Sequence, residues 1–202
     1  MGVAVLVLYV VWFLVVVALR VIVQKRRTGD TGLRLEGGQA RPGSIERAAG
    51  RLFVFGLFFG LATPLADLHG LEPIASGRAL QLAGAVLVVA GVAATSIAQF
   101  HMGSEWRIGV SRHEHTDLIV TGPFASVRNP IYTAIIVTAI GFVLMIPNWI
   151  GLVAVGLLVV TIELQVRFVE EPHLSTLHGP SFDEYRSRVG RFVPWVGRGR
   201  PS

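Results

Sequence analysis

Cysteine is missing from this chain of 202 residues, and charged residues are scarce. Without cysteine there is no disulfide framework, no thiolate catalysis and no cysteine-ligated zinc or iron–sulfur site. Only 15% of the residues are charged, whereas soluble domains carry about 25%. The sequence therefore has less polar surface than a protein dissolved in water requires.

Several cofactor and metal motifs are absent as well. The chain has no Walker A loop and no Gly-x-Gly-x-x-Gly motif after a strand pattern, so neither kind of nucleotide-binding loop is indicated. His113 and His115 could chelate a metal, but no sulfur ligand or suitably spaced carboxylate accompanies them. We therefore expect no metal site.

Apolar residues make up 52% of the chain and are concentrated in five long runs. A membrane-spanning helix needs about 20 mostly apolar residues. The sequence thus predicts an all-α, polytopic membrane protein with five transmembrane helices, of which the last two form a helical hairpin. The predicted spans cover residues 3–23, 52–71, 79–100, 131–146 and 149–169.

The basic residues predict the orientation of these spans. The net charge is +5, and 17 of the 18 basic residues lie on one side: eight from Arg20 to Arg51, three between spans three and four, and six from Arg167 onward. The positive-inside rule places these segments in the cytoplasm and the N-terminus outside. Because the basic residues accompany long apolar runs, membrane lipids are the expected partners, and no nucleic acid is expected.

We divide the chain into two parts. Residues 1–77 would form two transmembrane helices with a basic cytoplasmic linker. Residues 78–202 would form a core with a cytoplasmic loop (101–130) and a C-terminal segment (170–202).

Four charged residues interrupt the end of the last apolar run. Their spacing is that of a helix, which predicts one stripe on a helix face. The four residues are Glu163, Arg167, Glu170 and Glu171. One interpretation is a helix end tied together by ion pairs along the stripe. The other is a polar wall that faces a ligand, since charged groups at membrane depth tend to face a cavity. Glu163 lies one to two turns inside the apolar run, so we expect the polar wall.

A second informative stretch precedes the fourth span. Pro130 suits the first turn of a helix, where its missing N–H costs nothing. Arg128 and Asn129 would then lie at a helix N-terminus, which favours anions. Tyr132 adds an aromatic ring at the same level. We expect an anion-binding, aromatic and acidic site at one membrane interface.

The residues Arg128-Asn-Pro-Ile-Tyr132, with the lead-in Asp117-Leu-Ile-Val-Thr-Gly-Pro-Phe124, resemble the Arg-His-Pro-x-Tyr motif of the isoprenylcysteine carboxyl methyltransferase family of integral membrane methyltransferases. The segment 170–194 is similar to the same family's Glu-Glu and Phe-Gly-x-x-Tyr-x-x-Tyr pattern. The resemblance covers about residues 78–195. Asn129 replaces the motif histidine, and His178 and Phe182 replace a phenylalanine and a tyrosine.

The resemblance implies S-adenosylmethionine bound between the cytoplasmic loop and the C-terminal segment. It also implies a lipophilic acceptor, either prenylated or a small lipid, that enters from the bilayer; no obligatory protein partner is expected. Arg167 would orient the acceptor with support from Glu163. The cofactor contacts would fall on Thr116, Asp117, Leu118, Ile119, Phe124, Arg128, Asn129, Pro130, Tyr132, Glu170 and Glu171.

Two chemistries stay open for the catalytic residues Arg167, Glu170 and Glu171. An acceptor carboxylate needs no base and could be oriented by Arg167. An amine, thiol or hydroxyl acceptor needs a base, for which Glu170 and Glu171 are the candidates. Carboxyl O-methylation is the leading expectation.

Two other classes remain as alternatives. Membrane enone and steroid reductases share a similar motif layout, which would mean NADPH and hydride transfer. A transporter or scaffold would use the charged stripe only for structure. The preference for Arg over Lys is typical of a GC-rich genome, so we expect a bacterial cell membrane.

Overall fold

The computed structural model describes residues 1–33, 45–107 and 117–199. Within these ranges the chain is helical and forms no named strand, which confirms the all-α prediction. An isolated β-bridge joins Val127 and Gly190 in parallel. The helices, in chain order, are α1 (Gly2–Phe13), η1 (Leu14–Leu19), α2 (Arg20–Thr28), α3 (Ile45–Phe59), α4 (Ala62–Leu68), α5 (Arg78–Met102), η2 (Gly103–Glu105), η3 (Gly122–Ala125), α6 (Pro130–Met145), α7 (Trp149–Gln165), η4 (Val166–Glu170), α8 (Glu171–His178) and α9 (Pro180–Arg188).

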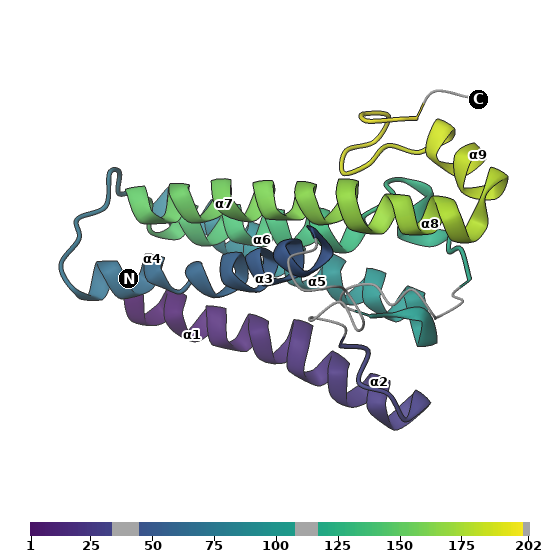
Figure 1. Cartoon of the computed structure of the whole chain (residues 1–202). Coiled ribbons are helices and arrows are strands. Elements are labelled where there is room, and N and C mark those ends of the chain that lie inside the picture. Colours follow the sequence, from purple (N-terminus) through teal and green to yellow (C-terminus); the bar gives the residue numbers. More distant parts are fainter. Residues whose placement is uncertain (34–44, 108–116, 200–202) are drawn as a thin grey trace.

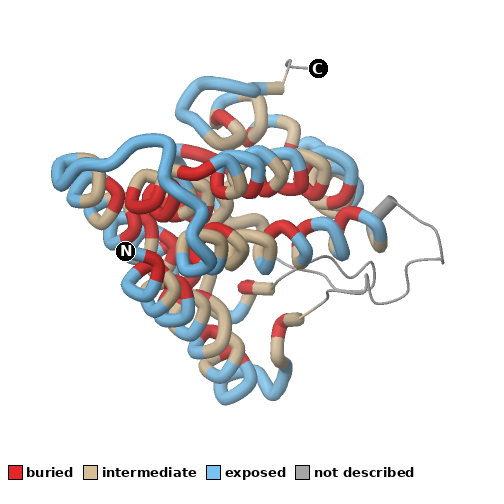
Figure 2. Tube along the Cα trace, turned by 90° about the vertical axis from the view of Figure 1, so that its left-hand side faces the viewer, coloured by how far each residue is buried: buried red, intermediate tan, exposed pale blue. Residues whose placement is uncertain are grey.

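In the part of the chain that the structure describes, four continuous helical stretches are long and apolar enough to cross a membrane. They are Gly2–Thr28, Arg47–Leu68, Arg78–Glu105 and Trp149–His178. Their apolar side chains face outward, as a lipid-facing surface requires: Val86, Val89 and Val153 are 66%, 68% and 60% exposed. Figure 2 shows the buried residues on the sides of the helices that face one another.

The fourth predicted span, residues 131–146, falls short of this length. It corresponds to α6, which begins at Pro130, ends at Met145 and has 16 residues. At about 1.5 Å per residue this is roughly 24 Å, less than the hydrocarbon thickness of about 30 Å. The five-span count is therefore not confirmed, although α6 and α7 do form the predicted hairpin.

Helix α6 packs most closely against α5, through glycine. A Cβ atom on Gly84 would lie 2.6 Å from the carbonyl oxygen of Gly141, and one on Gly141 would lie 2.7 Å from that of Gly84. The two backbones therefore touch, as small residues allow in membrane helix pairs. This contact joins the start of α5 to the end of α6; nearer the site residues, a Cβ atom on Gly91 would lie 2.9 Å from the carbonyl oxygen of Ala134.

The polar segments gather at one end of the bundle. Figure 1 shows α2, the C-terminal end of α5, α8 and α9 at one end, and the N-terminus with α4 at the other. At the far end the backbone N–H of Gly2 donates to Asp67 Oδ2 at 2.8 Å. The candidate site residues on α6, η4 and α8 thus share the end that carries the basic segments.

Candidate active site

A cavity of about 210 Å³ opens between several helices. Its walls come from α1 and η1, α3, the end of α5, η3, the start of α6, and α8 and α9. Its inner part is apolar, with Val16, Val17, Phe53 and Leu57 on the wall. Its outer part carries the polar groups of the loop and the C-terminal segment. The predicted site residues that line the cavity are Asp117, Leu118, Ile119, Phe124, Arg128, Asn129, Pro130, Tyr132, Glu170 and Glu171.

A tyrosine–carboxylate pair lies on the cavity wall. The hydroxyl of Tyr132 donates to Glu170 Oε1 at 2.5 Å, and Gln165 Nε2 donates to the same oxygen at 3.4 Å. The ring of Phe53 packs edge-on against Tyr132, with 5.6 Å between the centroids. Because both residues of the pair border a cavity with apolar walls, Glu170 is the carboxylate best placed to meet a ligand.

The turn η4 positions this pair. It is a π-helical segment (Val166–Glu170) within the otherwise α-helical stretch that starts at Trp149. An extra residue in one turn rotates the rest of the helix about its axis, and such π turns are frequent at functional sites. Glu170 consequently faces the cavity, whereas Arg167 does not.

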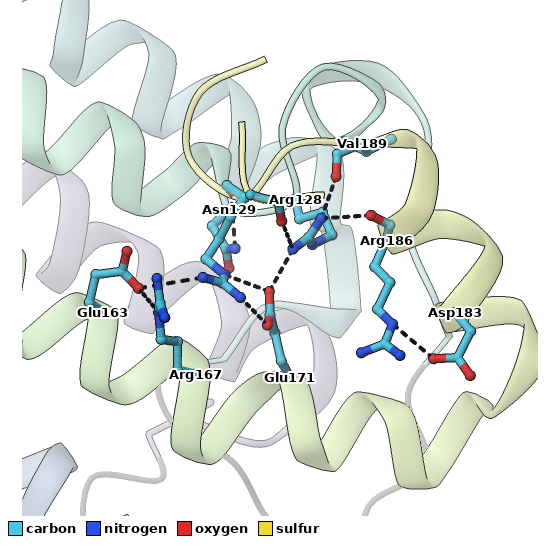
Figure 3. A network of polar contacts seen from close by, with 10 residues as sticks. Arg128, Asn129, Glu163, Arg167, Glu171, Asp183, Arg186 and Val189 are labelled. Atoms are coloured by element: carbon cyan, nitrogen blue, oxygen red, sulfur yellow. Dashed lines mark hydrogen bonds and ion pairs between the residues drawn. The ribbon is translucent and has the colours of Figure 1, made fainter. Parts of the chain in front are cut away.

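This rotation corrects the expectation of a single charged stripe. Arg167 is 55% exposed, pairs with Glu163 Oε2 at 2.6 Å, and neither residue lines the cavity. Glu171 pairs with other arginines and not with Arg167. Figure 3 shows that Arg191 links the two groups: its Nη1 lies 3.7 Å from Glu163 Oε2, and its Nη2 binds Glu171. The predicted acceptor-orienting role of Arg167, with Glu163 as its support, therefore has no support from the geometry.

Glu171 joins two arginines from distant parts of the chain (Figure 3). Arg128 Nη2 donates to Glu171 Oε1 at 2.8 Å. Arg191 binds the same carboxylate with both arms of its fork, Nε to Oε1 at 2.8 Å and Nη2 to Oε2 at 2.7 Å. Bidentate pairs of this kind are among the strongest ion pairs in proteins. They hold the segment after α9 against the start of α8.

Arg128 also binds the backbone of that segment. Its guanidinium donates to the carbonyl oxygens of Arg186 at 3.1 Å, of Gly197 at 3.0 Å and of Val189. Only its Nε–H, which is buried, has no partner among the described residues. Arg128 therefore mainly fixes the C-terminal segment, and a single N–H is left for a ligand. The sequence had suggested that the whole guanidinium would bind an anion.

Asn129 and Pro130 occupy the helix start as predicted, at the N-cap and N1 positions of α6. The Asn129 side chain donates to Arg191 O at 3.2 Å. Nearby, Tyr185 holds η3 in place by donating to Phe124 O at 2.6 Å, and burial raises the pKa of Tyr185 to about 12. Tyr185 is thus protonated at every pH of interest and can keep this bond.

Some predicted residues lie outside the described part of the chain, namely Thr116, His113 and His115. Within residues 1–33, 45–107 and 117–199, no three His, Asp or Glu side chains cluster as metal ligands would.

Two sets of site residues escaped the sequence reasoning. Arg191 lies in a loop whose sequence has no helical or strand periodicity. The preceding residue must be glycine, because a Cβ on Gly190 would overlap Val193 O. The other set lies in the first two membrane-spanning stretches and includes Trp12 and Phe53. In the sequence these residues are recognisable only as parts of apolar runs. Nothing in the local pattern showed that they would line the same cavity as the loop before α6.

Comparison with known proteins agrees with this geometry. The family model for phospholipid methyltransferases matches residues 74–181, which is more than half of the chain. The chain is 29% identical over 111 residues to the nickel-cobalt-cadmium resistance protein NccN of Alcaligenes xylosoxydans xylosoxydans, covering 54% of this chain and 51% of NccN. It is 29% identical over 89 residues to protein-S-isoprenylcysteine O-methyltransferase B of Arabidopsis thaliana, covering 44% and 45% of the two.

The chain spans about half the length of the curated relatives it matches. The family match includes the loop, the hairpin and Glu171, and it confirms the resemblance to membrane methyltransferases that the sequence motifs indicated. Together with the four long apolar helices, it identifies an integral membrane protein. The chain belongs to the phospholipid methyltransferase family.

Proposed function

We propose that this protein transfers a methyl group from S-adenosylmethionine to a lipophilic acceptor. The observation that carries the proposal is the cavity itself, which joins the Tyr132–Glu170 pair to an apolar wall formed by membrane-spanning helices. A water-soluble cofactor can reach the polar end, and a lipid chain suits the apolar end. An enzyme that joins these two kinds of substrate needs both ends in one cavity.

The residues at the polar end fit this cofactor. Trp106, Phe124 and Phe182 are buried aromatic side chains on the cavity wall, and such rings suit stacking on adenine and contact with a sulfonium. Glu170 adds a carboxylate that attracts a cation. The unpartnered Nε–H of Arg128 is a donor for a ligand oxygen. When bound, the cofactor would supply an electrophilic methyl group on a positively charged sulfur.

The chain's own contribution is mainly positioning and the exclusion of water. Glu170 would accept the proton that an amine or hydroxyl acceptor loses as its bond to the methyl carbon forms and the carbon–sulfur bond breaks. Tyr132 would fix the orientation of that carboxylate through its 2.5 Å hydrogen bond. A carboxylate acceptor would need no proton transfer, and Glu170 would then act through its charge alone.

Binding of the cofactor can be measured directly. We expect purified protein in detergent to bind S-adenosylmethionine or its demethylated product, and to bind NADPH far more weakly. Isothermal titration calorimetry with the three ligands makes the comparison. Tight NADPH binding without a response to the sulfonium would favour a reductase and overturn the proposal.

We further propose that the active-site end faces the cytoplasm of a bacterial cell, with the N-terminus outside. Ser76 lies between α4 and α5 and Ser181 lies in α9, and both are exposed. Figure 1 shows α4 and α9 at opposite ends of the bundle. Because the chain has no cysteine, a Ser76→Cys or Ser181→Cys variant carries one thiol. A membrane-impermeant maleimide added to intact cells should label the first variant and spare the second. The reverse pattern would invert the orientation.

A further inference from the structure

The first two membrane-spanning stretches, Gly2–Thr28 and Arg47–Leu68, lie outside the region that matches the family, which begins at residue 74. They nevertheless form the apolar side of the cavity, through Trp12, Val16, Val17, Phe53 and Leu57. This part of the wall is therefore specific to this chain's N-terminal half and can select among acceptors without altering the cofactor end.

Trp12 is the one cavity-lining residue of this group with a polar side-chain atom. Trp12 is 4% exposed, and its indole N–H has no hydrogen-bond partner within the described ranges of the chain. Buried donors are almost always paired, because an unpaired one has lost its hydrogen bond to water. The neighbouring side chains Val16, Val17 and Leu57 have no acceptor to offer. Trp12 borders two spaces, this cavity and a smaller one lined also by Tyr9, Thr63 and Thr138, and the cavity is the larger of the two. A ligand in the cavity would supply the missing acceptor.

Trp12 lies deeper than the Tyr132–Glu170 pair. It packs against Tyr9, with 5.2 Å between the ring centroids, and Tyr9 packs at the same distance against Phe142. Trp12 also borders the cavity beside Ile135. Since Ile135 and Phe142 lie about one and three turns beyond Tyr132 on α6, an acceptor atom at Trp12 belongs to the middle of a lipid and not to its methylated head.

We propose that Trp12 donates a hydrogen bond to a carbonyl oxygen of the acceptor lipid and so determines specificity for an ester-linked chain. This inference rests on the proposed function, because it assumes that the cavity holds a lipid acceptor. A glycerolipid has ester carbonyls between its head and its chains, whereas an isoprenoid tail has no oxygen at that depth. Trp12 thus favours the glycerolipid.

Two probes that differ only at this oxygen test the inference. We would measure the binding of dioleoyl phosphatidylethanolamine and of its ether-linked counterpart, which lacks both carbonyls, to the purified protein in detergent. We expect the ester lipid to bind about fivefold more tightly, as one net hydrogen bond allows. In Trp12→Phe the two lipids should bind equally, with the affinity for S-adenosylmethionine unchanged.

Trp149→Phe is the matched control, because Trp149 is 68% exposed and does not line the cavity; it should keep the ester preference. Equal binding of the two lipids by the unmodified protein would overturn the inference, and would indicate that water in the adjoining space of about 30 Å³ beside Trp12 satisfies the indole. A preference that survives in Trp12→Phe would also overturn it. Failure of the proposed function itself would be a different result: the protein would then not bind S-adenosylmethionine.

Discussion

Replacing Glu171 with alanine is expected to lower the free energy of unfolding by about 3–5 kcal/mol, the range for breaking one side of a buried ion pair. Glu171 is the shared acceptor for Arg128 and Arg191, whose side chains are 4% and 17% exposed. Without the carboxylate, the buried Arg128 charge loses its counter-ion and Arg191 loses its anchor. The segment after α9 should detach, and thermal unfolding in detergent together with proteolysis near residues 189–199 would report it.

The matched control is Glu184→Ala. Glu184 also pairs with an arginine, Arg188, at 3.4 Å, but both side chains are 69% exposed. Exposed pairs contribute about 0–1 kcal/mol, so this variant should unfold near the temperature of the unmodified protein. Equal and small effects of the two substitutions would show that Glu171 does not hold the C-terminal segment.

Glu170→Gln is expected to reduce methyl transfer by about 100-fold or more, the lower end of what a positioned acid or base contributes. The amide keeps the size of the side chain and can still accept a hydrogen bond from Tyr132, so the fold should survive. It loses the negative charge that would face the sulfonium and the ability to take up a proton. Transfer of tritiated methyl groups from S-adenosylmethionine to an extract of membrane lipids measures the effect and also identifies the acceptor.

Glu163→Gln on the same helix is the control for Glu170→Gln. Because Glu163 and Arg167 pair with each other outside the cavity, we expect both Glu163→Gln and Arg167→Ala to retain turnover. This outcome differs from the acceptor-binding role that the sequence motif suggested for Arg167. Loss of turnover in Arg167→Ala with a normal rate in Glu170→Gln would move the acceptor to the other face of the helix and refute the assignment of the cavity as the active site.

The sequence alone determined the class of the protein and ten of the residues that line the cavity. Runs of apolar residues are a local property, and they predicted helical spans because only backbone groups paired within a helix are stable in lipid. The stretch from Asp117 to Tyr132 could also be read locally, since Pro130 suits a helix start and the motif lies in one short segment. Ten predicted residues accordingly line one cavity.

Tertiary structure alone decided which charged side chains face that cavity. A π turn at Val166–Glu170 separates Glu170 from Arg167, and an ideal helical period does not include the extra residue of such a turn. Arg191 reaches Glu171 across 20 residues, and Trp12 meets the core from outside the family region. Contacts of this kind depend on how distant segments pack, and residue spacing carries information only about neighbours within the same helix.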